Sequence, residues 1–343
     1  MTAQKNYQQF DPWSIIAPTH RPKREELLSS LKKKRVIVIS GPTGVGKSQM
    51  ALSIAQAIGG EILSADSMQI YRGMDIGTAK PSQQERTLVP HHLIDIREIS
   101  ESFNAVDFYY EAMKCCREIL QREKVPIVVG GTGFYLRVFL YGPPQGPASI
   151  PEVRKQLQDR METFGCEALY ERLQMLDPEY AKKITEHDRH KIIRALEIIA
   201  ILGQPVSSYP PPEEKPHMEF DCRCWFLYMQ REKLYHKVES RCDEMVAKGL
   251  IEEVRQLREK GLAHNSSASS AIGYRQALEF LQTNERAEEY THFLEKFKRA
   301  SRRYVKRQFT WFRKEPLFRW IDLEELGPEK AREFILQDYE QGW

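Results

Sequence analysis

The 343-residue chain lacks long apolar runs and has only six cysteines. No apolar run approaches the roughly 20 residues that cross a bilayer, and residues 1–13 lack the apolar core of a secretion signal. The cysteines include no Cys-x-x-Cys pair and indicate no disulfide framework. We therefore expect a cytoplasmic, monomeric protein that does not enter a membrane.

The chain also has little excess charge, because 51 Lys and Arg against 48 Asp and Glu leave a net charge of +3. Near the C-terminus, however, the charge is of one sign, and the only acid between residues 296 and 319 is Glu315. A solvated helix face normally mixes signs, so this stretch, interleaved with aromatic residues, predicts a track for a phosphate backbone. Four of its cations recur at helical spacing and are expected to form one basic stripe: Arg299, Arg302, Arg303 and Lys306.

Glycines gather in residues 41–48, which fit the pattern G-x-x-x-x-G-K-[ST] as Gly41, Pro42, Thr43, Gly44, Val45, Gly46, Lys47 and Ser48. The apolar segment 36–40 predicts a strand before this loop, and the amphipathic segment 49–58 predicts a helix after it. A loop between a strand and a helix N-terminus directs backbone N–H groups at phosphates. Lys47 would reach the terminal phosphate and Ser48 would hold Mg²⁺. The motif thus predicts a polyphosphate site of the type found in ATP-binding and other nucleotide-binding proteins.

A carboxylate typical of P-loop ATPases is missing. In those enzymes a second apolar strand ends in an Asp that assists Mg²⁺, but here the candidate strand 125–129 is followed by Gly130-Gly131-Thr132-Gly133. The Asp occurs instead after the apolar segment 61–65, at Asp66. In an open parallel sheet both segments end at the crevice that holds the P-loop. One carboxylate placed as a base and one glycine-flanked hydroxyl favour transfer of a group off a diphosphate over hydrolysis of a triphosphate.

The element pattern predicts an α/β fold, with a P-loop NTPase-like parallel sheet flanked by helices and interrupted by an all-helical insertion domain. We expect an N-terminal appendage at 1–34, the first part of the core at 35–147, the insertion at 148–206 and the second part of the core at 207–343. Within the insertion, helices are expected at 152–163, 167–176 and 189–202. A helical block between two connections is expected to swing onto bound RNA.

Eight short stretches follow one another between about residues 36 and 320: the loop 41–48, SADSMQIY (64–71), GMDIGTAKP (73–81), PHHLID (90–95), GGTG (130–133), RALE (194–197), IGYR (272–275) and KRQFTWFR (306–313). In these stretches the chain resembles the bacterial tRNA dimethylallyltransferases, also called tRNA isopentenyltransferases. Each stretch alone is a weak signal, but the ordered set is specific. The resemblance implies transfer of a dimethylallyl group from dimethylallyl diphosphate to N6 of the adenosine 3′ of the tRNA anticodon (position 37), with release of diphosphate and with Mg²⁺ as cofactor.

This chemistry indicates roles for the residues of the pocket. The exocyclic amine of adenine is a poor nucleophile, and a base that removes its proton as the C–N bond forms overcomes that handicap; Asp66 is our candidate. The P-loop amides, Lys47 and Mg²⁺ would stabilise charge on the departing diphosphate. The resemblance assigns transition-state stabilisation to Thr132, a further diphosphate contact to Arg231 and an auxiliary site role to Arg154.

An acceptor base in folded RNA must leave its stack, which costs least in a single-stranded loop such as the anticodon loop. This chain departs from the family pattern at Ser270, where some members of the family carry a basic residue. The resemblance implies that the anticodon stem-loop is held by Asp66, Ser67, Met68, Gln69, His190, Lys191, Arg194, Gly273, Tyr274, Arg275, Arg299, Arg302, Arg303, Lys306 and Arg307.

Other interpretations remain open. Asp66 could cap the next turn, Thr132 could be a small residue tolerated in a glycine turn, and Arg231 could be a solvated charge at a helix start. The whole chain could be a P-loop kinase in which Asp66 binds an acceptor hydroxyl, but the missing Asp after residue 129 and the basic segment count against it. A non-catalytic, GTPase-like RNA-binding module is disfavoured because the guanine-specificity motif is absent.

Overall fold

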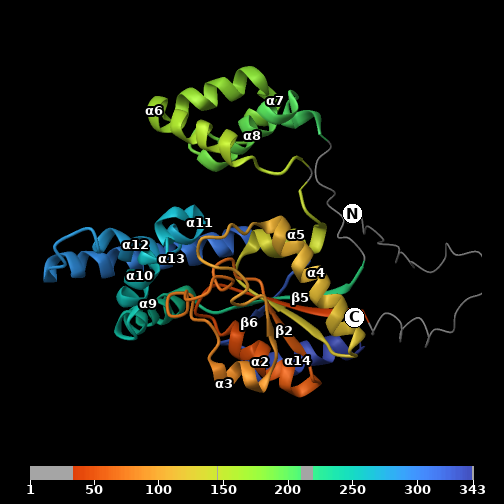
Figure 1. Ribbon diagram of the computed structural model, residues 1–343. Coiled ribbons are helices and arrows are strands. Elements are labelled where there is room, and N and C mark those ends of the chain that lie inside the picture. Colours follow the sequence, from red (N-terminus) through yellow and green to blue (C-terminus); the bar gives the residue numbers. More distant parts are fainter. Residues whose placement is uncertain (1–33, 145, 210–218, 342–343) are drawn as a thin grey trace, which may run out of the picture.

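The computed structural model describes residues 34–144, 146–209 and 219–341, so the expected appendage, except for residue 34, lies outside the described residues. Six parallel strands form one sheet in the order β3-β2-β4-β1-β5-β6 (Figure 1). They are β1 (Arg35–Ser40), β2 (Glu61–Ser64), β3 (His91–His92), β4 (Pro126–Val129), β5 (Asp221–Tyr228) and β6 (Arg319–Asp322).

The sheet is buried on both faces, as its near-continuous apolar strands require. Side chains alternate along β1, so that Val36 and Val38 enter one core while Ile37 and Ile39 enter the other. The second core lies against α2 (Lys47–Ile58), α14 (Pro328–Gln341) and the start of α9 (Arg231–Ala247). The short helix α3 (Gln83–Leu88) lies near α2 in Figure 1.

The first core lies between the sheet and a larger set of helices. These are α4 (Ala105–Gln121), α5 (Gly133–Tyr141), α10 (Leu250–Glu259), η2 (Leu262–His264), α11 (Ser266–Ser269), α12 (Tyr274–Phe280) and α13 (Ala287–Phe312). Helix α13 packs against both α9 and α5, so it passes beside the edge of the sheet where the strands end. In the part of the chain that the structure describes, no helix is long and apolar enough to cross a membrane.

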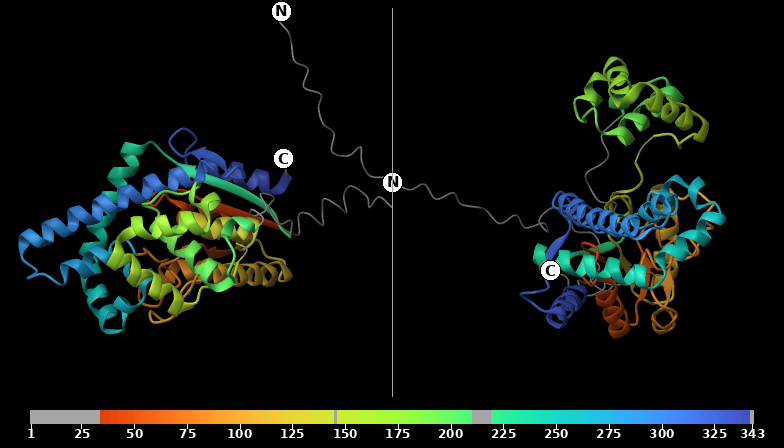
Figure 2. Two further views of the ribbon diagram at one scale, coloured as in Figure 1. Left: turned by 90° about the horizontal axis from the view of Figure 1, so that it is seen from above. Right: turned by 90° about the vertical axis from the view of Figure 1, so that its left-hand side faces the viewer.

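A group of helices stands apart from the sheet: α6 (Pro151–Leu176), α7 (Pro178–Ala181), α8 (Arg189–Leu202) and the turn η1 (Val206–Ser208) (Figures 1 and 2). They have their own core, with Leu173 and Ile192 fully buried. Gly165 interrupts α6 with a non-helical backbone, which matches the break expected between 163 and 167. The predicted α/β fold with a helical insertion is confirmed.

The carboxyl ends of β1, β2 and β4 bring three loops to one crevice. β1 leads into the P-loop, β2 leads to Asp66, and β4, which lies between them, leads to Gly130. A side chain at Gly130 is excluded, because a Cβ there would lie 2.2 Å from the carbonyl oxygen of Ala65. The missing side chain therefore lets the loops after β2 and β4 touch, and it fixes Asp66 beside the P-loop.

Candidate active site

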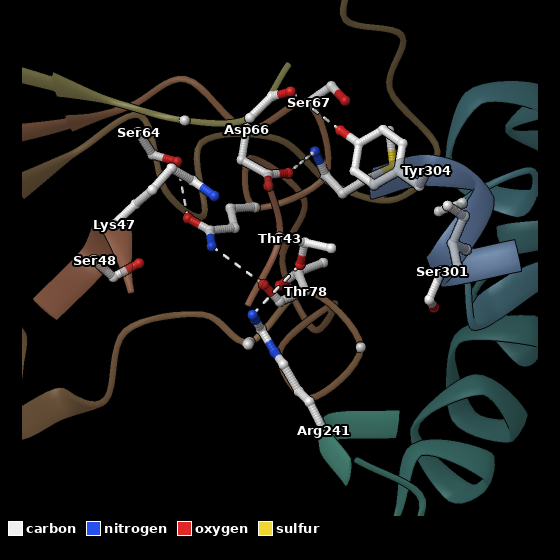
Figure 3. Close-up of a pocket in the computed structure, with 18 of the residues that line it drawn as sticks. Thr43, Lys47, Ser48, Ser64, Asp66, Ser67, Thr78, Arg241, Ser301 and Tyr304 are labelled. Atoms are coloured by element: carbon white, nitrogen blue, oxygen red, sulfur yellow. Dashed lines mark hydrogen bonds between the residues drawn. The ribbon is translucent and has the colours of Figure 1, made fainter. Parts of the chain in front are cut away.

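A cavity of about 450 Å³ opens at this crevice (Figure 3). Three of its walls come from loops at strand ends, and the fourth comes from α9 and α13. Its polar lining includes Thr43, Lys47, Ser48, Ser64, Asp66, Ser67, Gln69, Thr78, Arg241, Ser301, Tyr304, Arg307 and Gln308. The structure thus brings the P-loop and Asp66 together, as the sequence predicted.

The P-loop is held to α13 by one glutamine. The side-chain oxygen of Gln308 accepts the N–H of Thr43 at 2.9 Å, and its nitrogen donates to the carbonyl oxygen of Gly131 at 3.0 Å. Gln308 is buried and therefore bonds the loop after β1 to the loop after β4. Within the P-loop, Lys47 Nζ donates to the carbonyl oxygen of Pro42 at 2.9 Å.

Two partly buried cations and one carboxylate dominate the charge of the cavity. Burial, followed by repulsion from Arg241, lowers the pKa of Lys47 to about 7, and the opposing attraction of Asp66 does not compensate. Burial also lowers the pKa of Arg241, again against the attraction of Asp66. The guanidinium of Arg241 lies 3.5 Å from Thr43 Oγ1. Buried charge without a full complement of counter-charge is costly, so this cavity favours an incoming anion.

Asp66 lies in the cavity between Lys47 and Tyr304 in the view of Figure 3. Its Oδ1 accepts the N–H of Met68 at 2.9 Å. The turn-capping interpretation is therefore correct for one carboxylate oxygen, and this bond orients the group. Because the carboxylate also lines the cavity, capping and proton transfer are compatible in one side chain.

Thr132 joins the loops after β2 and β4. Its hydroxyl accepts the N–H of Ser67 at 3.2 Å and lies 3.5 Å from Ser67 Oγ. Thr132 precedes α5 and stands next to the cavity, whose lining includes its neighbours Gly131 and Ser67. Contact with a departing diphosphate would require a change in these bonds, so its catalytic role stays a prediction.

The structure does not bring Arg231 to the cavity. It is exposed at the start of α9, where its Nε donates to Tyr235 Oη at 2.9 Å and its guanidinium stacks over the Tyr235 ring. This position matches the alternative interpretation, in which Arg231 is a solvated charge at the start of a helix. The cavity's second cation is instead Arg241, ten residues later on the same helix.

The predicted residues of the helical insertion also lie outside the cavity. Arg154 and Arg194 both bind the buried carboxylate of Glu197, at 3.4 and 2.9 Å, and Arg194 also donates to the carbonyl oxygen of Pro147 at 2.5 Å. Lys191 pairs with Asp188 at 3.3 Å, and His190 is exposed beside it. Arg154 therefore has a structural partner in this conformation and lies outside the catalytic cavity.

The basic residues of α13 have different neighbours. Arg302 pairs with Glu239 of α9, and Lys298 pairs with Asp243 of the same helix at 2.7 Å, because α9 packs along this side. Lys306 is exposed. The other side of α13 forms, with α12, a basic pocket of about 370 Å³ that includes Arg275, Lys296, Arg299, Arg303 and Arg307 together with Glu279. Three residues line both this basic pocket and the cavity: Ser270, Ile272 and Arg307.

Tyr274 was expected to contact RNA, but it is fully buried and its hydroxyl donates to Glu253 at 2.5 Å. Gly273 precedes α12 and is buried as well, with its N–H bonded to Gln276. Arg275 is exposed and lines the basic pocket. Of the three consecutive residues, the structure therefore presents Arg275 to a partner and uses the other two for packing.

Sequence reasoning missed Arg241 as a cavity residue and gave Gln308 and Tyr304 no role. Arg241 lies among acidic residues, at Glu239 and Asp243, and so has the appearance of an ordinary surface helix residue. Gln308 lies inside the KRQFTWFR stretch, which was the only signal that could have pointed to it. Tyr304 reaches the carbonyl oxygen of Gly131 at 3.4 Å, and burial raises its pKa, with Asp66 acting in the same direction.

The donor set of the cavity fits a magnesium ion bound jointly with phosphates. In proteins Mg²⁺ often keeps substrate phosphates and water in its shell; here the Ser48 hydroxyl, which lines the cavity, would hold it together with a phosphate. Among the described residues no group of three or more His, Cys, Asp or Glu could hold a metal ion.

Comparison with known proteins identifies the family of this chain. The family model described as IPP transferase matches residues 69–315. Proteins named tRNA dimethylallyltransferase are 58% identical over 308 residues in Protochlamydia amoebophila (90% of each chain) and 48% identical over 316 residues in Chlamydia pneumoniae (92% of each chain).

Solved structures agree as well. The tRNA isopentenylpyrophosphate transferase of Bacillus halodurans has a TM-score of 0.64 at 36% identity, with 90% of this chain and 97% of that chain covered. A eukaryotic dimethylallyltransferase acting on tRNA has a TM-score of 0.73 at 29% identity, with 89% and 79% covered. The match of the family model and of relatives over almost the whole length shows that this chain belongs to the IPP transferase family.

Proposed function

We propose that this protein transfers the dimethylallyl group of dimethylallyl diphosphate to N6 of the adenosine 3′ of the anticodon, position 37 of tRNA, and releases diphosphate. One observation carries the proposal: a P-loop lysine, a second partly buried cation and a carboxylate meet in one cavity. This combination suits a reaction with an anionic leaving group and a nucleophile that must lose a proton. The relatives are named tRNA dimethylallyltransferase, which supports transfer of a dimethylallyl group to tRNA.

On the leaving-group side, the bond between C1 of the allyl group and the diphosphate oxygen breaks, and negative charge accumulates on that oxygen. Lys47, Arg241 and the P-loop amides stabilise this charge in a cavity where interactions are stronger than in bulk water. The arriving diphosphate also restores the full charge of Lys47, because it supplies the counter-charge that the free site lacks.

On the nucleophile side, N6 of the adenine forms the bond to C1, and its proton passes to Asp66. The Met68 N–H bond fixes Asp66 Oδ1, so the base is oriented before the substrate arrives. The products are the N6-dimethylallyl adenosine, diphosphate and a proton on Asp66 that returns to solvent. Thr132, beside Ser67, is the candidate for stabilising the transition state.

Mg²⁺ bound to the diphosphate and Ser48 would neutralise part of the leaving-group charge. Within the protein, Ser48 follows Lys47 in the first turn of α2. Phosphate oxygens held there would also receive N–H groups of that turn. The expectation that Mg²⁺ is the cofactor therefore rests on the P-loop and its donor atoms.

RNA would reach the cavity across the basic pocket of α12 and α13. The two hollows share Arg307 and Ser270, so a backbone on the cations of the basic pocket could deliver one unstacked base into the cavity. The helical insertion would cover the RNA from the other side with His190 and Lys191. An RNA acceptor also fits the cytoplasmic location expected from the sequence.

The first prediction concerns the reaction itself. Purified protein with Mg²⁺ and unmodified tRNA should transfer label from dimethylallyl diphosphate to the tRNA, and none from γ-labelled ATP. Nuclease digestion and mass spectrometry should locate the product at N6 of adenosine 37. Transfer from ATP alone would favour the kinase interpretation and refute the proposal.

The second prediction concerns Asp66. Asp66→Asn preserves the oxygen that accepts the Met68 N–H but cannot take a proton, so kcat should fall about 10²- to 10⁴-fold while tRNA affinity is retained. Asp243→Asn, the same change outside the cavity on α9, should leave both unchanged. A collapse of tRNA binding in Asp66→Asn would make Asp66 a binding residue instead.

The third prediction concerns pH. Because the pKa of Lys47 is about 7 in the free protein, Lys47 is mostly neutral above that pH, and a bound diphosphate should recharge it. Binding of a non-reacting allylic thiolodiphosphate should therefore take up a proton between about pH 7 and 9 and weaken as pH rises. Titration calorimetry in buffers of different ionisation enthalpy measures this uptake, and Lys47→Met should abolish it. Equal proton uptake in both proteins would contradict the assignment.

The fourth prediction separates the two sides of α13. Arg299→Ala with Arg303→Ala should lower the slope of log Kd against log salt by about 1.4, since each single-strand phosphate contact contributes about 0.7. Arg302→Ala, whose charge is already paired with Glu239, should change the slope less. Fluorescence anisotropy with labelled tRNA provides the measurement. An unchanged slope in the double variant would remove the basic pocket from the interface.

A further inference from the structure

Glu253 of α10 accepts four hydrogen bonds, three from a loop of the cavity wall and one from a tyrosine of α12. Its Oε2 accepts the N–H groups of Asp75 and Ile76 at 3.0 and 2.7 Å. Its Oε1 accepts the N–H of Gly77 at 3.2 Å and the hydroxyl of Tyr274 at 2.5 Å. One carboxylate therefore fixes three consecutive backbone amides and one buried phenol.

The packing around this carboxylate is close. A Cβ at Gly77 would lie 2.4 Å from the Tyr274 ring, so the loop rests directly on that ring. Leu250 and Leu257, on the same face of α10, are buried in the core beneath it. The negative charge of Glu253, together with burial as the larger cause, raises the pKa of Tyr274 and keeps it a donor. The loop has little freedom to move while these bonds persist.

The loop that Glu253 binds continues into the lining of the cavity. Gly77 and Thr78 line the cavity, and the carbonyl oxygen of Thr78 accepts a hydrogen bond from Gln69 Nε2 at 3.2 Å. Gln69 Oε1 in turn accepts from Ser64 Oγ at 2.8 Å. A continuous set of bonds thus runs from Glu253 through the loop to the amide of Gln69, three residues from Asp66.

We infer that Glu253 is a positioning residue for the acceptor base, which acts by holding the 75–78 loop and through it the Gln69 amide on the Asp66 side of the cavity. The inference rests on the proposed function. The P-loop is bonded separately, because Gln308 accepts the N–H of Thr43 and Lys47 donates to the carbonyl oxygen of Pro42. Loss of Glu253 should therefore affect the RNA substrate and spare the diphosphate.

The residue type fits this role. Only a carboxylate offers acceptor positions on both oxygens for four donors at once, whereas a glutamine amide turns one of its ends into a donor. Glu253→Gln would leave at least one N–H or the Tyr274 hydroxyl opposite another donor. An unpaired buried donor costs more than the bond itself contributes, so the loop would shift.

The test compares Glu253→Gln with Glu252→Gln, the same substitution one residue earlier on the exposed side of α10. In Glu253→Gln, kcat/KM for tRNA should fall about 10-fold or more, while the Kd of a non-reacting allylic thiolodiphosphate stays at the wild-type value. Combining Glu253→Gln with Gln69→Ala should add little to the effect of Gln69→Ala alone, because both changes remove the same arrangement. Glu252→Gln should behave as wild type.

Three results would overturn the inference: wild-type kinetics in Glu253→Gln, an equal loss of diphosphate affinity, or additive effects with Gln69→Ala. If Glu253→Gln does not fold, the same measurements are made on Tyr274→Phe, which removes one of the four donors. In that variant kcat/KM for tRNA should fall by a smaller factor. Failure of the wild-type protein to modify tRNA would instead refute the proposed function.

Discussion

The interaction on which the site depends is the imbalance between two partly buried cations and one carboxylate. Lys47 and Arg241 come from different parts of the chain, and Asp66 only partly offsets them. In the free cavity this imbalance lowers the pKa of Lys47 to about 7, so the lysine carries only part of its charge near neutral pH. In the proposed reaction a diphosphate would supply the missing counter-charge and restore the charge of Lys47.

Helix α13 connects this charge balance to the RNA surface. Its inner side carries Gln308 and Tyr304, which contact the P-loop and the loop after β4. Its outer side carries Arg299 and Arg303 in the basic pocket. The cations proposed to bind the phosphate backbone and the residues that hold the P-loop therefore share one rigid element, which would favour catalysis when both substrates are present.

The features of the site that depend on neighbouring residues could be predicted from the sequence. A strand, a glycine loop and a helix need only neighbouring residues, so 36–58 and Asp66 were placed correctly. Arg241 could not be found, because its role depends on how α9 packs against the P-loop. The pairing of Arg302 could not be predicted for the same reason, since it depends on Glu239 of α9. Helical spacing defines a face, but only tertiary packing shows what covers it.

Packing also constrains how the helical insertion can close on RNA. Glu197 holds Arg154, Arg194 and the N–H of Ile150, and Arg194 holds the carbonyl oxygen of Pro147. These bonds attach the segment that leads into the helical insertion to α8, so this segment belongs to the insertion, called the lobe below. A rotation on the N-terminal side must therefore take place before Pro147, because a rotation after it would break a buried ion cluster. The lobe can then carry Lys191 and His190 toward RNA as one body, with its core intact.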